Sequence, residues 1–191
     1  MKKIDFTPGL PQVANPKFSI PKTNLWVFGY GSLMWNPGFS HTDSQPARIY
    51  GFHRRLCLWS TQYRGSIARP GLILGLDRGG SCRGMAFRAH DHNIKHTVSY
   101  LFDREMITEA YNPIIISIHL QCGEVVNALT FVSKTGHPNY AQRMDIKEAV
   151  SLIRNAKGPR GTNVEYILNT VDYLNALGIR NTELHRIAAA L

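Results

Sequence analysis

Long hydrophobic runs are missing from this chain of 191 residues. No segment approaches the roughly 18 consecutive apolar residues that a membrane-spanning helix needs. The opening residues, Met1 to Pro8, include lysines and an aspartate, and they have no apolar stretch of the kind that signal peptides carry. We therefore expect a protein without a membrane segment that resides in the cytoplasm.

Cysteine is also scarce. The three cysteines, Cys57, Cys82 and Cys122, are odd in number and widely spaced in the chain. This excludes a disulfide framework and any CxxC zinc or redox motif. We expect them to be buried small side chains of a protein kept in a reducing compartment.

Acidic side chains are few, since 13 Asp and Glu stand against 22 Lys and Arg, for a net charge of +9. Such an excess indicates an anionic partner or substrate: a nucleic acid, an acidic membrane surface or an acidic metabolite. Charge alone leaves all three open. The hydrophobic fraction of 43% is enough to bury a core, and the length favours one domain.

The common signatures of nucleotide and nucleophile sites are absent. The segment 28–33, Phe-Gly-Tyr-Gly-Ser-Leu, follows a predicted strand, but a dinucleotide fingerprint would need glycine where Met34 stands. No GxxxxGK[ST] phosphate loop occurs. Tyr30 and Met34 lie two residues either side of Ser32, so the GxSxG pattern of a nucleophilic serine fails too. We predict that no nucleotide cofactor is needed.

Three histidines, His90, His92 and His96, have a spacing that can bind zinc on a helix. The glutamate of an HExxH motif is missing, and Lys95 stands inside the cluster. Polar residues at the start of a helix produce the same pattern. We predict that the protein has no metal site.

Proline is concentrated at the start of the chain, and residues 1–24 are predicted to form a flexible arm ahead of a domain at 25–191. Short β-branched and aromatic runs then predict strands, punctuated by glycine and proline. Apolar spacings of three and four after residue 140 predict two helices, with Gly178 following the second. Strands first and helices later indicate an α+β fold with a strongly curved sheet or barrel. The runs are 25–28, 48–52, 56–59, 72–74, 84–87, 114–118 and 125–132 for strands, and 146–153 and 164–174 for helices.

One helix is predicted between strands, within 91–111, and it carries a carboxylate on its apolar face. At about 100° per residue, Glu105 falls within the apolar stripe of Val98 and Leu101. Asp103 and Arg104 fall where solvent is expected. A carboxylate aimed at a core is costly and needs a partner or a function. It could also end the stripe at a frayed terminus or pair with a buried arginine.

A basic and aromatic stretch over 48–69 allows two interpretations. It could be a platform for single-stranded nucleic acid on a small barrel. Alternation along strands instead predicts core aromatics with outward arginines, which we favour. The residues concerned are Arg48, Tyr50, Phe52, Arg54, Arg55, Trp59, Tyr63, Arg64 and Arg69.

Seven further segments carry distinctive motifs: 27–37, 63–65, 69–72, 82–88, 101–106, 158–166 and 177–179. Together they resemble the ChaC-like γ-glutamylcyclotransferases. The resemblance follows the family's order and covers about residues 25 to 187. It implies a small β-barrel with surrounding helices and an activity that splits glutathione into 5-oxoproline and cysteinylglycine.

The resemblance also implies roles for individual residues. It makes Glu105 the general acid/base. It also makes Tyr30 to Leu33 the loop that holds the γ-glutamyl group. Glutathione is anionic at pH 7, which fits the arginine excess, so we predict Arg64 as a contact for it and Tyr111 and Tyr166 as secondary contacts. The predicted substrate-binding residues in the segment 27–33 are Val27, Phe28, Gly29, Tyr30, Gly31, Ser32 and Leu33.

In one place the sequence departs from the family, which usually has a glycine between the glutamate and the tyrosine. Here Thr108, Glu109 and Ala110 precede Tyr111. Loss of the glycine predicts a stiffer segment beside the site.

The implied reaction needs neither metal nor cofactor, because the α-amine of the γ-glutamyl residue is itself the nucleophile. Two alternatives remain open. The protein could act on other γ-glutamyl amines or amino acids, or it could be a basic barrel that binds single-stranded nucleic acid. An inward-facing Glu105 distinguishes an enzyme from the latter.

Overall fold

A closed barrel of five strands lies at the centre of the structure, a computed structural model that describes residues 19–191. The strands neighbour one another in the order β1, β3, β2, β4, β5, and β1 closes the ring by pairing in parallel with β5. This confirms the predicted α+β class with a barrel. The strands are β1 (Trp26–Gly29), β2 (His41–Ser60), β3 (Gly71–Ala89), β4 (Tyr111–Leu120) and β5 (Val125–Ser133).

The barrel begins immediately after a short irregular segment. Residues 19–24 have no regular secondary structure, and the N–H of Asn24 donates to the Asp91 carboxylate at 2.8 Å. Most of the arm expected over 1–24 falls on residues 1–18, outside the described residues. β1 follows with all four residues buried.

β2 and β3 are the longest strands and pair along most of their length. Each was expected as two shorter strands, at 48–52 and 56–59 and at 72–74 and 84–87, and this was wrong. Gly51 has a φ of 82° at an irregularity in β2, and Gly79 and Gly80 have φ of 97° and 69° opposite it in β3. These glycines bend the strands without ending them, and strongly bent strands can close a small barrel.

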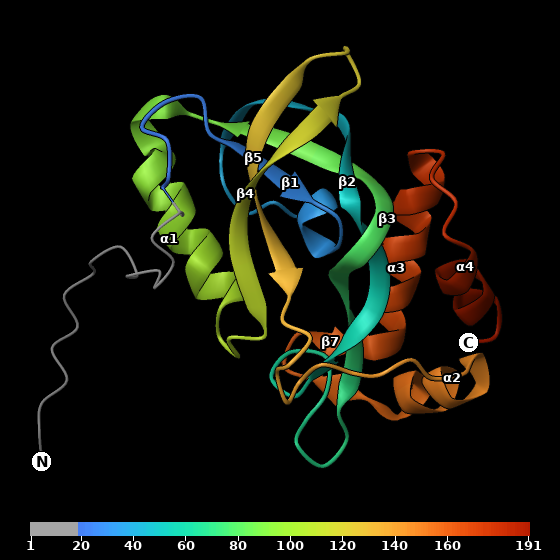
Figure 1. Cartoon of the computed structure of the whole chain (residues 1–191). Helices are drawn as coiled ribbons and strands as arrows, with labels where there is room; N and C mark the ends of the chain where they lie inside the picture. Colours follow the sequence, from blue (N-terminus) through green and yellow to red (C-terminus); the bar gives the residue numbers. More distant parts are fainter. Residues whose placement is uncertain (1–18) are drawn as a thin grey trace, which may run out of the picture.

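Helices cover two sides of the barrel (Figure 1). α1 (Ile94–Glu105), preceded by the short turn η2 (Asp91–Asn93), lies on one side. The C-terminal helices lie on the other, and they include the two that the apolar spacing predicted. These are α2 (Ile146–Asn155), α3 (Asn163–Ala176) and α4 (Thr182–Ala189), with η1 (Ser32–Met34) after β1 and the hairpin β6 (Lys157–Gly158) and β7 (Gly161–Thr162) before α3.

α1 is shorter than the pattern over 91–111 suggested. The N–H of Met106 still bonds to the carbonyl of Phe102, but Glu109 has a φ of 53° in the turn that leads into β4. This left-handed conformation cannot continue an α-helix and favours glycine. A glutamate therefore adopts here the conformation that suits the glycine expected from the family pattern.

Two expectations about burial need correction. Cys57 and Cys82 are buried as expected, but Cys122 is exposed in the turn between β4 and β5. Arg54 and Arg55 are 6% and 8% exposed and do not face outward. Both are buried because the fold supplies acceptors for them, which strand alternation does not reveal.

α3 begins with a complete capping box. The Thr162 hydroxyl accepts from the N–H of Glu165 at 3.1 Å, and the Glu165 carboxylate accepts from the N–H of Thr162 at 2.8 Å. We expect Thr162→Ala to lower the free energy of unfolding by about 1 kcal/mol, because one cap acceptor is lost. Thermal denaturation checks this, with a fall of ~2–4 °C expected. An unchanged melting temperature would contradict a stabilising cap.

No helix within the described residues is long and apolar enough to cross a membrane.

Candidate active site

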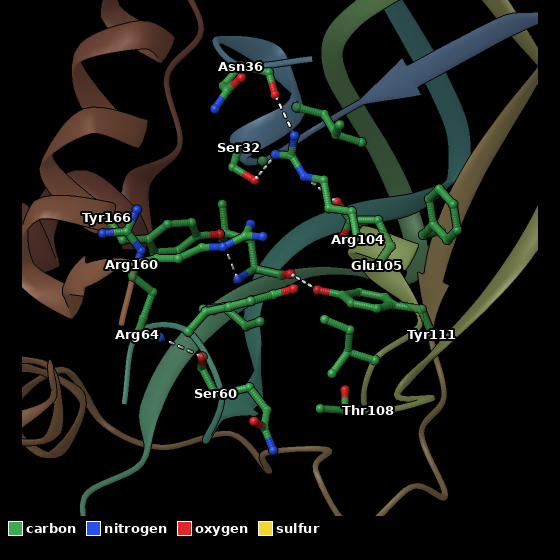
Figure 2. Close-up of a pocket in the computed structure, with 18 of the residues that line it drawn as sticks. Ser32, Asn36, Ser60, Arg64, Arg104, Glu105, Thr108, Tyr111, Arg160 and Tyr166 are labelled. Carbon is green, nitrogen blue, oxygen red and sulfur yellow. Dashed lines mark hydrogen bonds and ion pairs between the residues drawn. The ribbon is translucent and has the colours of Figure 1, made fainter. Parts of the chain in front are cut away.

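A cavity opens where the ends of several barrel strands meet the last turn of α1 and the first turns of α3 (Figure 2). Aromatic side chains form part of its wall, and a carboxyl, arginines and hydroxyls face into it. The lining residues are Tyr30, Gly31, Ser32, Leu33, Trp35, Asn36, Trp59, Ser60, Thr61, Gln62, Tyr63, Arg64, Ile73, Leu74, Arg104, Glu105, Ile107, Thr108, Tyr111, Phe131, Arg160 and Tyr166.

Glu105 is the last residue of α1 and its side chain, 17% exposed, lines this cavity. Burial raises the pKa of the carboxyl above its ordinary value of 4.5, while the cations of Arg104 and Arg160 act in the opposite direction. Asp103 is exposed, as expected. The inward carboxylate predicted from the helical pattern is therefore present, with a nearby arginine as its ion-pair partner.

Arg104 was expected to face solvent, and this was wrong, since its side chain is only 8% exposed. Nε contacts Oε1 of Glu105 at 3.1 Å. Nη2 donates to Oγ of Ser32 at 2.9 Å, and Nη1 donates to the Asn36 carbonyl at 2.7 Å and the Tyr100 hydroxyl at 3.0 Å. Figure 2 shows this guanidinium between α1 and the η1 turn. It links the carboxyl to the turn that forms the opposite wall.

Three buried tyrosines complete the wall. The hydroxyl of Tyr30 donates to the Phe131 carbonyl at 2.8 Å, and that of Tyr111 donates to the Leu74 carbonyl at 2.9 Å. The Tyr166 hydroxyl accepts from the N–H of Leu74 at 3.2 Å, and no acceptor within residues 19–191 takes its proton. Burial raises the pKa of all three. They are therefore neutral at pH 7, and Tyr166 has a proton to donate to a ligand.

The turn after β1 presents unpaired backbone donors. In the described part of the chain, the N–H groups of Gly31, Ser32 and Leu33 have no acceptor; the turn's own bond runs from the Met34 N–H to the Gly31 carbonyl at 2.9 Å. Successive N–H groups of this kind form a concavity that binds anions. The turn is thus suited to a carboxylate or an oxyanion.

Across the cavity from this turn, the loop that follows β2 meets the turn between β6 and β7. The Arg64 guanidinium lies over the Tyr166 ring at 5.6 Å, and that of Arg160 lies over the Tyr63 ring at 3.8 Å. Gly158 allows the close approach, because a Cβ there would collide with the Tyr63 carbonyl. No carboxylate within residues 19–191 pairs with Arg160. The wall of the cavity therefore includes two arginine cations as well as the turn with unpaired N–H groups.

Most residues that the sequence singled out come together in this cavity. Val27, Phe28 and Gly29 do not line it, because they lie in β1, buried and paired with β3. Sequence reasoning missed Arg104 and Arg160, although Arg160 lies in a turn that the resemblance included. Those brought together are Tyr30, Gly31, Ser32, Leu33, Arg64, Glu105, Tyr111 and Tyr166.

The histidine cluster contributes nothing to the cavity. The rings of His90 and His92 lie 5.2 Å apart in the segment before α1. Among the residues described, no group of three or more His, Cys, Asp or Glu side chains is arranged to hold a metal ion.

The pH dependence of activity should reflect the environment of Glu105. In its predicted role as a base the carboxyl must be ionised, so kcat/KM should rise as pH increases through the raised pKa of this group, above 4.5. We expect Arg104→Gln to move this acidic limb to higher pH, because the nearest cation that lowers the pKa is removed. Arg160→Gln should move it in the same direction by less. If the acidic limb of the kcat/KM profile did not move in Arg104→Gln, the group that titrates would be one other than Glu105.

The family model of the ChaC-like proteins matches residues 25–190, and the chain belongs to this family. Curated relatives from several organisms are named glutathione-specific γ-glutamylcyclotransferase. The one from Escherichia coli (strain K12) is 36% identical over 167 residues, 87% of this chain and 72% of the relative. The one from Schizosaccharomyces pombe is 29% identical over 186 residues, and the match covers 86% of this chain and 90% of the relative.

A solved structure shares the fold. The γ-glutamyl cyclotransferase specific to glutathione from yeast matches with a TM-score of 0.80 at 20% identity, and the match covers 87% of this chain and 95% of that one. The barrel and its helices are therefore the architecture of this class of protein.

Proposed function

We propose that the protein is a γ-glutamylcyclotransferase that acts on glutathione and releases 5-oxoproline and cysteinylglycine. The observation that carries the proposal is a buried carboxyl with a raised pKa that shares one cavity with unpaired backbone donors and an unpaired arginine. Two relatives that span most of the chain carry this activity in their names. The three unpaired cysteines agree with the reducing cytoplasm, where glutathione is abundant.

The substrate supplies its own nucleophile. The α-amino group of the γ-glutamyl residue attacks the γ-carbonyl carbon of the same residue, a five-membered lactam closes, and the bond to the cysteine nitrogen breaks. The cavity must hold the folded-back conformer in which amine and carbonyl meet. Orientation of this kind is worth up to ~7–11 kcal/mol of the barrier.

Glu105 moves the proton. As a carboxylate it accepts a proton from the substrate's ammonium, which frees the amine to attack, and as a carboxylic acid it returns that proton to the leaving nitrogen. The second proton that the ring nitrogen loses protonates the released amine. A pKa raised by burial brings the carboxyl closer to neutral pH, where such a shuttle is most effective. The ion pair with Arg104 holds the carboxyl in place.

The rest of the cavity matches an anionic peptide. The N–H groups of Gly31, Ser32 and Leu33 are suited to the α-carboxylate or to the oxyanion that develops on the γ-carbonyl oxygen. Arg64 and Arg160 are suited to the second carboxylate, at the glycine end of glutathione.

The decisive experiment is to incubate the protein with glutathione and to follow cysteinylglycine and 5-oxoproline. Equal amounts of both products are expected. The same assay with γ-glutamyl amines, which lack the terminal carboxylate, tests the alternative substrate class. Salt-sensitive binding of an oligonucleotide without any turnover would instead favour the nucleic-acid alternative.

Turnover should survive a chelator. The proposed chemistry uses a carboxyl, backbone donors and the substrate's amine, so excess EDTA should change kcat by less than about twofold. Chelator-sensitive turnover that zinc restores would contradict this and would direct attention to His90, His92 and His96.

A further inference from the structure

Arg54 is a buried cation without an acidic partner. It is 6% exposed, and no carboxylate within residues 19–191 forms an ion pair with it. Its donors go to backbone carbonyls instead: Nε donates to the Tyr30 carbonyl at 2.5 Å and Nη2 to the Arg83 carbonyl at 2.7 Å. Burial of an unneutralised charge is costly, so the position is unusual for a purely structural arginine.

Its neighbour Arg55 shows the contrast. Arg55 is equally buried, at 8%, but its guanidinium pairs with Asp77 at 3.3 Å and donates to the Tyr140 hydroxyl at 3.3 Å. Consecutive residues of a strand point to opposite faces. One arginine of the pair is therefore neutralised away from the cavity, and the other keeps its charge on the side of Tyr30.

The bond from Arg54 sets the direction of one peptide group. Tyr30 and Gly31 line the cavity and Arg54 does not, so the Tyr30 carbonyl points away from the cavity toward the guanidinium. In a trans peptide the N–H points opposite to the carbonyl. The unpaired N–H of Gly31 consequently points toward the cavity, and a charge-assisted bond to the carbonyl polarises it further.

The charge of Arg54 also reaches the cavity wall. Burial raises the pKa of Tyr166, and the charge of Arg54 is among the influences that act in the opposite direction. An anion bound at Gly31 would therefore have this positive charge behind the peptide group that binds it.

We propose that Arg54 is a positioning residue for substrate: it fixes the Tyr30–Gly31 peptide and provides an unneutralised charge behind it, so that the turn binds the α-carboxylate of the γ-glutamyl group. The inference rests on the proposed function, because it takes the γ-glutamyl group as the ligand. It adds a residue outside the cavity that determines affinity for one particular carboxylate.

The test compares two ligands in a protein that cannot turn them over. In a Glu105→Gln background, the Kd of glutathione is measured beside that of γ-aminobutyryl-cysteinylglycine, which lacks only the α-carboxylate. Arg54→Met should weaken glutathione binding by about tenfold or more and change binding of the analogue by less than about twofold. Arg55→Met is the matched control, since it removes an equally buried arginine from the same strand and should leave the ratio of the two Kd values unchanged.

A purely structural role predicts a different result. Equal weakening of both ligands by Arg54→Met, or no change in either, would overturn the proposal. If Arg54→Met does not fold, Arg54→Lys replaces it, because lysine keeps the charge but has fewer donors. It should weaken glutathione by about threefold with the analogue unchanged, and equal effects would again overturn the proposal. Turnover of glutathione by the unsubstituted protein is measured separately. A failure of the proposed function can therefore be distinguished from a failure of the proposal for Arg54.

Discussion

Glu105→Gln should abolish turnover of glutathione while the fold remains intact. Glutamine has the same shape as glutamate, so packing at the end of α1 is kept and the amide oxygen can still accept from Arg104. It cannot take a proton from the ammonium or return one to the leaving nitrogen, and general acid/base catalysis of this kind is worth about 10²–10⁴ in rate. The measurements are kcat with glutathione and the melting temperature of both proteins.

Asp103→Asn is the matched control for this substitution. Asp103 lies two residues earlier in α1 with its side chain exposed, so the same loss of a carboxylate there should be mild. Retention of more than about a tenth of the unsubstituted activity by Glu105→Gln would remove this residue from the proton-transfer role.

Acetylation of the substrate's α-amine should eliminate the products entirely. In the proposed reaction this amine forms the new carbon–nitrogen bond, and an amide nitrogen in its place is not nucleophilic. We expect no cysteinylglycine from N-acetyl-glutathione under conditions in which glutathione gives cysteinylglycine and 5-oxoproline. Chromatographic detection of both products provides the measurement.

Hydrolysis is the competing reaction that this substrate detects. If water were the nucleophile, the acetylated peptide would release cysteinylglycine and N-acetylglutamate at a rate similar to that of glutathione. The cavity argues against this, because no serine or cysteine in its lining is paired with a base. Release from the acetylated peptide as fast as from glutathione would identify a hydrolase.

Local patterns in the sequence were sufficient to predict α1, α2, α3 and the inward carboxylate, whereas α4 was not predicted. The periodicity of α1 depends only on residue spacing, and Glu105 continues the stripe of Val98 and Leu101 into the cavity. Arg104 could not be placed in this way. A helical angle gives the direction of a Cβ, but a long guanidinium side chain can reach acceptors in another segment, as this one does at Ser32 and Asn36.

Contacts between residues far apart in the chain explain the other differences between the predictions and the structure. Alternation along β2 could not reveal that Arg54 would meet carbonyls of Tyr30 and Arg83, because those acceptors come from other parts of the barrel. Glycines between the runs 72–74 and 84–87 were likewise interpreted as a break between strands, although Gly79 and Gly80 have the positive φ of a bend within one strand. The residue type of Glu109 gives no signal of its left-handed conformation, because glutamate rarely adopts it; only the glycine usual in the family points to such a conformation here.

The bonds that close the cavity join residues far apart along the chain, and this has a consequence for how the protein acquires activity. Tyr30 reaches Phe131 across 101 positions, and Arg64 reaches Thr162 across 98. Because loops of this size must close before such contacts contribute, chains dominated by non-local pairing fold slowly. During synthesis the cavity cannot assemble until the segment that becomes α3 has left the ribosome. Recovery of turnover after dilution from denaturant therefore reports the completed tertiary structure. The circular dichroism of the helices depends on local contacts and should return earlier.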